Sequence, residues 1–199
     1  DTAGNDTTTD ITGADLTIRN ATGVGASASD ALNLNVTNLG VTTASGPGFI
    51  TETNNLGLNT VNFNTNNLTL TASGSITQTQ ALTAGNLIVT TLDNAGSDIV
   101  LDDALNNVTN AEFHLLNAAG TTAVDADIAF READGLNIVT IETLGVSSNV
   151  TLDSAGAVTN SGTIVASGIE LLGDGHRPAG RESQLANAFL LHRAGDERG

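Results

Sequence analysis

The chain of 199 residues contains no cysteine, methionine, tryptophan, tyrosine or lysine. Without cysteine it can form no disulfide, no thiolate nucleophile and no cysteine-ligated zinc or iron–sulfur site. All six basic residues are arginines, and 22 acidic residues bring the formal net charge to −16. A chain this acidic repels phosphate backbones, so we expect no nucleic-acid partner bound through a basic patch.

Long apolar runs are missing as well, so we expect no membrane span, which needs about 18 or more consecutive apolar residues. Intrinsic disorder is disfavoured, because the chain is rich in Val, Ile and Leu, which disordered acidic chains lack. The chain starts with neither an initiator methionine nor a signal-type segment, and we therefore expect a processed product or an internal fragment.

The composition changes near Gly175. Residues 1–175 carry two arginines and 19 acids, whereas residues 176–199 carry four arginines and three acids. Asn and Thr, which number 22 and 29 in the whole chain, almost disappear from the second part. We therefore predict a body over 1–175 and an atypical C-terminal tail over 176–199.

The body alternates between apolar and polar residues with a period of two. Examples are Leu32–Thr37 (LNLNVT), Leu68–Thr71 (LTLT) and Val150–Asp153 (VTLD). This alternation predicts short strands with apolar side chains on one face and Thr or Asn on the other. Gly, Asn, Asp and Ser, the residues that favour turns, separate the strands.

Internal repetition indicates how these strands are arranged. Residues 67–89 (NLTLTASGSITQTQALTAGNLIV) align without a gap with 149–171 (NVTLDSAGAVTNSGTIVASGIEL), at an offset of 82 residues. Within the copies, Leu68 to Leu87 and Val150 to Ile169 are each 19 residues apart. A repeat of about 20 residues built from short strands predicts an all-β fold, a parallel β-helix or β-solenoid.

In such a solenoid we expect inward Leu, Val and Ile to form columns, outward Thr to cover the faces, and stacked Asn side chains to share hydrogen bonds at the corners. Eight or nine coils fit into residues 1–175 and would form a rod of roughly 40 Å at the strand spacing of a sheet. The alternative fold is an antiparallel sandwich, which also uses short alternating strands but predicts no such repetition.

Four segments resemble the passenger repeats of filamentous-haemagglutinin-like exoproteins, adhesins that bacteria export by two-partner secretion. They are Gly23–Leu39, Phe49–Val61, Ser73–Thr91 and Asp98–Val108. The resemblance covers about residues 11–172 and implies a right-handed parallel β-helix, an adhesive role and a location that is secreted or on the bacterial surface. It also implies a host or neighbouring-cell surface protein or glycan as partner, and an outer-membrane transporter for the full-length protein. The family's secretion domain is not apparent here.

The densest charged cluster is the main candidate for chemistry. An enzyme alternative, a β-helical polysaccharide lyase or hydrolase, would centre its site on Asp125, Asp127 and Arg131. The structural alternative places these residues, with Glu132 and Asp134, outward on one coil and its turn. Sugar-binding sites usually stack the sugar on Trp or Tyr, which this chain lacks. We therefore predict no enzyme activity and no catalytic residues.

The remaining motifs favour structural roles, and we predict no metal and no cofactor site. Asp98, Asp102 and Asp103 offer oxygen ligands for calcium, but no calcium-binding loop motif surrounds them. Gly23–Ala28 matches a dinucleotide-binding pattern, yet a strand-like segment follows it where that pattern needs a helix. His114 is the only histidine of the body and has no second histidine or cysteine beside it.

The tail leaves two hypotheses open. Residues 182–193 (ESQLANAFLLHR) can form a short amphipathic helix, with Leu185, Ala188, Phe189 and His192 near one face. Such a helix would cap the last coil, because a solenoid exposes unpaired strands at its ends. Alternatively, the abrupt change of composition indicates that the tail is not native to the repeat protein.

Overall fold

The computed structural model describes residues 8–43, 45–144 and 147–173. Both the predicted boundary near residue 175 and the predicted tail over 176–199 lie outside the described residues. Within the described ranges the regular elements are all strands, namely β1 (Ile11–Ala21), β2 (Leu32–Thr43), β3 (Gly48–Glu52), β4 (Leu56–Asn62), β5 (Leu68–Ala72), β6 (Ile76–Gln78), β7 (Leu82–Leu92), β8 (Ile99–Leu101), β9 (Asn107–Leu116), β10 (Ile128–Glu132), β11 (Leu136–Glu142), β12 (Asn149–Ser154), β13 (Val158–Val165) and β14 (Gly168–Gly173).

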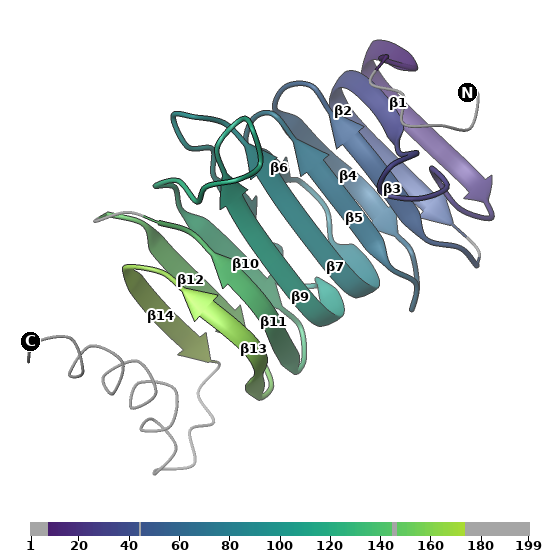
Figure 1. The fold of residues 1–199 in the computed structure, drawn as a ribbon. Helices are drawn as coiled ribbons and strands as arrows, with labels where there is room; N and C mark the ends of the chain where they lie inside the picture. The colour runs from purple at the N-terminus through teal and green to yellow at the C-terminus, as the bar shows by residue number, and fades with distance from the viewer. Residues whose placement is uncertain (1–7, 44, 145–146, 174–199) are drawn as a thin grey trace, which may run out of the picture.

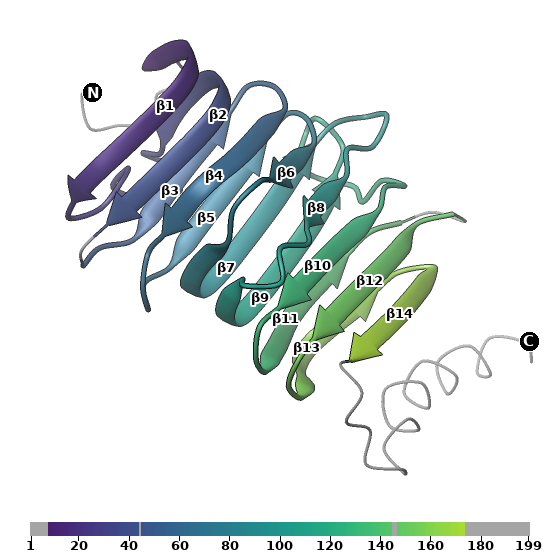
Figure 2. The same cartoon turned by 180° about the vertical axis from the view of Figure 1, so that it is seen from behind.

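The strands wind into a β-solenoid in which paired strands run parallel (Figures 1 and 2). After β1 and β2, the odd-numbered strands β3 to β13 stack in order as one sheet, and the even-numbered strands β4 to β14 stack as a second. We call these the odd sheet and the even sheet. Each coil thus passes through one odd strand and one even strand. Every pairing between two named strands is parallel, which excludes the antiparallel sandwich. The isolated bridges Ser27–Asp30 and Leu116–Ala123 are antiparallel.

The 19-residue spacing in the sequence corresponds to real stacking. Leu68 of β5 is the register partner of Leu87 of β7, and Val150 of β12 is the register partner of Ile169 of β14. The number of coils is lower than expected, about seven with a mean spacing of about 22 residues. Longer connections between β7 and β10 lengthen the coils there. Seven coils form a rod of roughly 34 Å at the usual strand spacing.

The core consists of columns of inward side chains that run along the rod. Register pairing stacks Ile50, Leu70, Val89, Phe113 and Ile141 in the odd sheet, and each is at most 2% exposed. The predicted columns of Leu, Val and Ile are present, and Phe63, Phe113 and Phe130 are buried among them. The rings of Phe113 and Phe130 lie with centroids 5.2 Å apart, so the two sheets contact each other across the coil.

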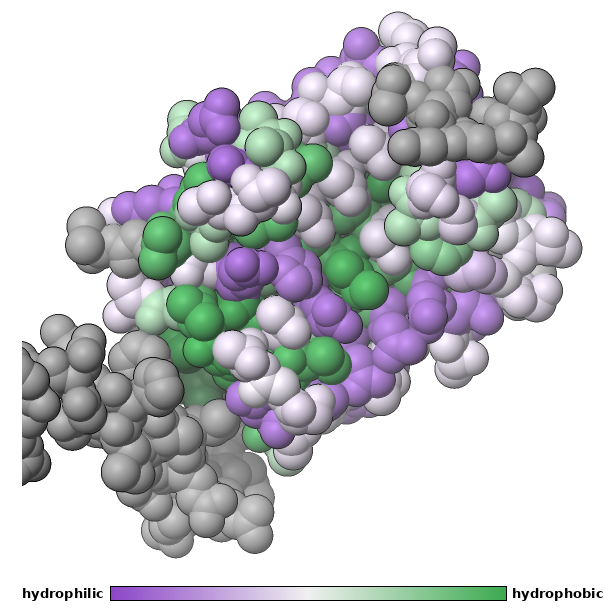
Figure 3. All heavy atoms as spheres, in the orientation of Figure 1, coloured by the Kyte–Doolittle hydropathy of each residue, from purple (hydrophilic) through white to green (hydrophobic). Residues whose placement is uncertain are grey.

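A ladder of asparagine side chains runs along the rod, as the sequence predicts. Asn86 Nδ2 donates to Asn67 Oδ1 at 2.6 Å, and Asn110 Nδ2 donates to Asn86 Oδ1 at 2.6 Å. Asn137 then donates to Asn110 Oδ1 at 2.8 Å and to Ser161 Oγ at 3.0 Å. Asn86 and Asn110 therefore each donate to one neighbouring coil and accept from the other. Figure 3 shows hydrophilic side chains as a band along this face of the rod.

Candidate functional site

The feature that departs most from a regular coil is one edge of the rod, where the chain passes from the odd sheet to the even sheet. The connections 53–55 and 73–75 have three residues each, but 93–98 has six and 117–127 has eleven. We define the loop-bearing edge as 93–98, 117–127, 143–144 and 147–148, which belong to three consecutive coils. The enlarged connections stack on one another and continue the order of the coils.

Backbone and side-chain hydrogen bonds hold the first two connections together. Asp93 N–H donates to the Leu116 carbonyl at 2.9 Å, and Ala118 N–H donates to Asn94 Oδ1 at 3.1 Å. Gly96 has a φ of +85°, and a Cβ there would meet the Asp125 carbonyl oxygen. Only glycine fits this close approach without strain.

Asp125 joins the second connection to the third. Its two carboxylate oxygens accept hydrogen bonds of 2.6 Å from the Ser147 and Ser148 hydroxyls. These hydroxyls, with that of Ser147 the stronger, lower the pKa of Asp125. On the first connection, the Ala95 N–H and then the Ser97 hydroxyl lower the pKa of Asp93 in the same way. The carboxylates of the edge are therefore held in place by defined partners.

The edge also carries apolar side chains. Leu92 and Leu116 are register partners at the ends of β7 and β9 and are half-buried. Val124 is also half-buried, and its carbonyl accepts a hydrogen bond of 3.0 Å from the Leu144 N–H. The side chain of Leu144 is 56% exposed. Leu144 is thus the exposed large hydrophobic side chain of the loop-bearing edge, whereas Leu92, Leu116 and Val124 are half-buried and Val124 packs against the core.

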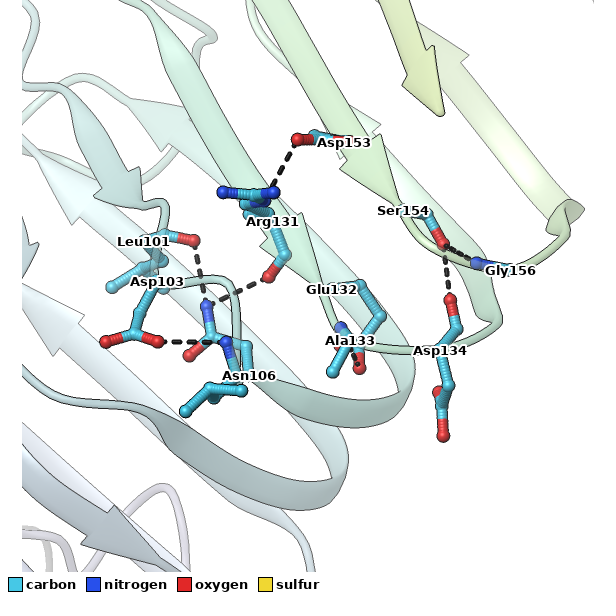
Figure 4. A network of polar contacts seen from close by, with 11 residues as sticks. Leu101, Asp103, Asn106, Arg131, Glu132, Ala133, Asp134, Asp153, Ser154 and Gly156 are labelled. Carbon is cyan, nitrogen blue, oxygen red and sulfur yellow. Dashed lines mark hydrogen bonds and ion pairs between the residues drawn. The ribbon is translucent and has the colours of Figure 1, made fainter. Parts of the chain in front are cut away.

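The predicted acidic cluster does not assemble around Arg131. Arg131 lies on the outer side of β10, where its Nε forms a 3.0 Å ion pair with Asp153 of the next coil (Figure 4). Asp127 lies on the loop-bearing edge, where its Oδ1 accepts the Asn149 N–H at 2.7 Å. Asp125 bonds to serines as described. Each candidate residue thus has a structural partner. No observation here tests enzyme activity, so both the expected lack of activity and its alternative, a polysaccharide lyase or hydrolase, stay predictions.

Glu132 points into the coil, so the prediction that it lies outward is wrong. It is 1% exposed, and its Oε2 accepts the Val108 N–H of the preceding coil at 2.9 Å. Oε1 accepts the Ala133 N–H at 3.0 Å (Figure 4). Burial raises the pKa of Glu132 to about 7, and the negative charge of Asp134 adds to the rise, whereas the N–H donors oppose it.

Asn106 is a second buried polar residue at the same corner. It is fully buried, and its Oδ1 accepts the Leu82 N–H at 2.8 Å. Its Nδ2 donates to the carbonyls of Leu101 and Arg131 at 3.0 Å each, and so joins three coils (Figure 4). No local pattern in the sequence identifies Asn106, because its role depends on partners 24 and 25 residues away.

Glu52 repeats the arrangement of Glu132 at the opposite corner. It ends β3, is fully buried, and accepts the N–H groups of Val36 and Thr53 at 2.9 Å each. A signal for both glutamates was present in the sequence. The period of two that places Ile50 and Phe130 inward also places Glu52 and Glu132 inward, two residues later.

Among the remaining candidates, His114, Asp98 and Asp103 have structural partners too, and Asp102 lies exposed on the turn 102–106. His114 lies between two glutamates, with Nδ1 at 3.1 Å from Glu142 and Nε2 at 3.7 Å from Glu112. Asp98 accepts the Asp127 N–H at 2.9 Å, and Asp103 accepts the Leu105 N–H at 2.9 Å. Among the described residues, no three acidic or histidine side chains form a group that could hold a metal ion. The segment 23–28 lies in the β1–β2 connection and opens no helix.

Comparisons with known proteins complete the description. The part of the chain that the structure describes contains no helix with the length and apolar character needed to cross a membrane. No protein-family model matches the chain, and neither a curated protein nor a solved structure matches it. On its own features, the chain is a β-solenoid compatible with a β-helical repeat protein.

Proposed function

We propose that this chain is a rod segment of a filamentous-haemagglutinin-like exoprotein, secreted or held on a bacterial surface. In this proposal it attaches to a protein or glycan on a host or neighbouring cell, and an outer-membrane transporter exports the full-length protein. Two features support the family assignment, namely the repeat segments that resemble such passengers and the parallel solenoid into which they fold.

The loop-bearing edge is the observation that carries the adhesive role. At the opposite corner, where the chain returns from the even to the odd sheet, 79–81, 133–135 and 155–157 have three residues each, and 63–67 and 102–106 have five each. After β2, the chain thus places its longest connections, of six to eleven residues, on one edge in three consecutive coils. In repeat proteins, insertions that map to one face frequently form the binding surface.

The chemistry of this edge suits attachment. It carries the exposed Leu144, the half-buried Leu92 and Leu116, and the exposed carboxylates of Asp125 and Asp127. Binding interfaces commonly combine an apolar core with a polar rim. Hydrogen bonds between the coils hold these groups, so little conformational entropy is lost when a partner binds.

A matched pair of leucines tests the proposal. Leu144 is 56% exposed on the loop-bearing edge, and Leu105 is 71% exposed on the turn 102–106 at the opposite corner. The full chain can be labelled with one amine-reactive dye at its α-amino group, because it has no lysine. Binding to epithelial cells and to Gram-negative bacterial cells is then measured by flow cytometry for the wild type, Leu144→Asp and Leu105→Asp.

We expect Leu144→Asp to weaken attachment by roughly fivefold or more, the equivalent of losing about 1 kcal/mol at an interface. Leu105→Asp should bind like the wild type. Equal losses in the two variants would contradict an attachment surface on this edge, and absence of wild-type binding to every cell type would contradict the adhesive role itself.

A further inference from the structure

The C-terminal end of the rod exposes core side chains. Six large hydrophobic residues are exposed in the described part of the chain, and four of them, Val165, Ile169, Leu171 and Leu172, lie in β13 and β14. Ile169 and Leu171 occupy inward columns and are 39% and 38% exposed, whereas their register partners Val150 and Leu152 are at most 1% exposed. The last coil therefore lacks a cover over its apolar columns.

The backbone of this end is uncovered too. β13 and β14 are the outermost strands in the order of the sheets, so each offers one unpaired edge. Unpaired parallel edges and exposed apolar columns favour association with another coil. The N-terminal end differs. There, Ile11, Leu16 and Ile18 of β1 pack against the core and are half-buried, so none of them is an exposed large hydrophobic residue.

The same chain supplies a segment that suits this surface. Residues 174–199 follow directly after Gly173, the last residue of β14. Residues 174–181 can span up to roughly 26 Å when extended, which allows 182–193 to return over the end of the coil. In 182–193, Leu185 and Phe189 are spaced four residues apart, the spacing of one helix face.

Charge favours the same contact. Residues 147–173, which form β12 to β14 and their connections, contain Asp153 and Glu170 but no basic residue. Residues 176–199 contain four of the six arginines. Residues 176–199 thus have a net charge of +1 against −2 for 147–173, and 182–193 itself holds one arginine, Arg193, and one acid, Glu182.

We propose that residues 182–193, which lie outside the described residues, cover the C-terminal end of the solenoid, with Leu185 and Phe189 packed on Ile169 and Leu171. The cover keeps the free edges of β13 and β14 from pairing with a second copy. This inference is independent of the adhesive function, since it concerns the end of the rod and not its loop-bearing edge.

Engineered cysteine pairs test the contact directly, because the chain has no native cysteine. The full-length double variant Leu171→Cys/Phe189→Cys is compared with Leu171→Cys/Asn187→Cys, in which the second cysteine lies on the other side of the predicted helix. A third variant, Leu105→Cys/Phe189→Cys, reports random collision with a distant site. Non-reducing gel mobility and mass spectrometry separate disulfides within one chain from disulfides between chains.

We expect the first pair to form its disulfide within one chain, roughly tenfold faster than either control, since a held pair exceeds the millimolar effective concentration of a merely tethered one. Equal rates in all three variants would overturn the proposal. A disulfide mainly between chains would overturn it as well and would identify a second copy as the occupant of the end face.

The mass in solution supplies a second readout that needs no cysteine. Deletion of 176–199 and the substitution Phe189→Asp should each convert a monomer into end-to-end assemblies, as measured by light scattering after size-exclusion chromatography. Asn187→Asp, the matched control, should leave the chain monomeric. If the deletion variant stays monomeric at the same concentration, the segment does not protect the end of the rod.

Discussion

The buried carboxyl of Glu132 makes the stability of the solenoid depend on pH, and the substitution Glu132→Gln should remove that dependence. The side chain is 1% exposed, and burial raises its pKa to about 7, with a further contribution from Asp134. Because the pKa in the folded chain lies above that of the unfolded chain, folding takes up a proton between these two values. Glu132 therefore favours the folded chain at low pH, and this contribution is lost as the pH rises through 7.

The magnitude follows from the two pKa values. A rise from 4.5 to about 7 corresponds to about 3 kcal/mol over the full range of pH. Between about pH 5 and pH 8, the Glu132 contribution to the free energy of unfolding should fall by roughly 2–3 kcal/mol. Glutamine cannot titrate. Its side-chain amide also has only one oxygen, so its NH2 group would face one of the two backbone N–H groups that donate to Glu132. The variant should therefore be less stable at low pH and show a smaller pH dependence.

Urea unfolding measured by far-UV circular dichroism at several pH values is the appropriate assay, because the chain has no Trp or Tyr for fluorescence. The series should stay above the isoelectric point of about 4.1 to limit precipitation. Glu170→Gln removes one negative charge from an exposed position on β14 and controls for the change in net charge. Asp134→Asn should reduce the pH dependence in part, since it removes the neighbouring charge but keeps Glu132.

The difference in unfolding free energy between wild type and Glu132→Gln is the decisive quantity. If it stays constant within about 1 kcal/mol from pH 5 to pH 8, Glu132 does not titrate in this range in the folded chain.

Four further substitutions are measured by the same urea unfolding at neutral pH. Asn106→Ala should cost about 3 kcal/mol or more, because it removes the buried hydrogen bonds to the Leu82 N–H and to two carbonyls, whereas Asn110→Ala in the half-buried ladder should cost only about 1 kcal/mol. Equal costs would contradict the assigned burial. Phe113→Ala should cost about 3–5 kcal/mol, since it opens a cavity in the core. Arg131→Ala should cost less than about 1 kcal/mol, because its ion pair with Asp153 is partly exposed.

Period-two alternation and repeat spacing were sufficient to predict the fold class. The 19-residue distance from Leu68 to Leu87 is a real stacking distance, and the asparagine ladder follows from the frequency of Asn at corners. The offset of 82 residues is not a whole number of coils, so the number of coils predicted from it, eight or nine, is too high. This offset aligns Leu68 of β5 in the odd sheet with Val150 of β12 in the even sheet, so the two copies share a strand–turn pattern but not a position in the coil.

The polar interior was harder to predict. Charged residues are rarely buried, and on that general rule Glu132 was expected on the surface. The alternation in β10 does predict an inward Glu132, because Ile128, Phe130 and Glu132 lie on the same side of the strand. No local pattern identifies the role of Asn106 or the exposure of Leu144 on the loop-bearing edge. Both depend on which residues of successive coils become neighbours, and therefore on the lengths of the connections.

Footprinting on bound cells tests most directly whether the loop-bearing edge attaches. The full chain is oxidised by hydroxyl radicals when free and when bound, and cleavage after arginine places Leu105 and Leu144 in separate peptides on either side of Arg131. The account predicts that binding protects Leu144 from oxidation and leaves Leu105 unchanged. Protection of Leu105 with Leu144 still oxidised would contradict it.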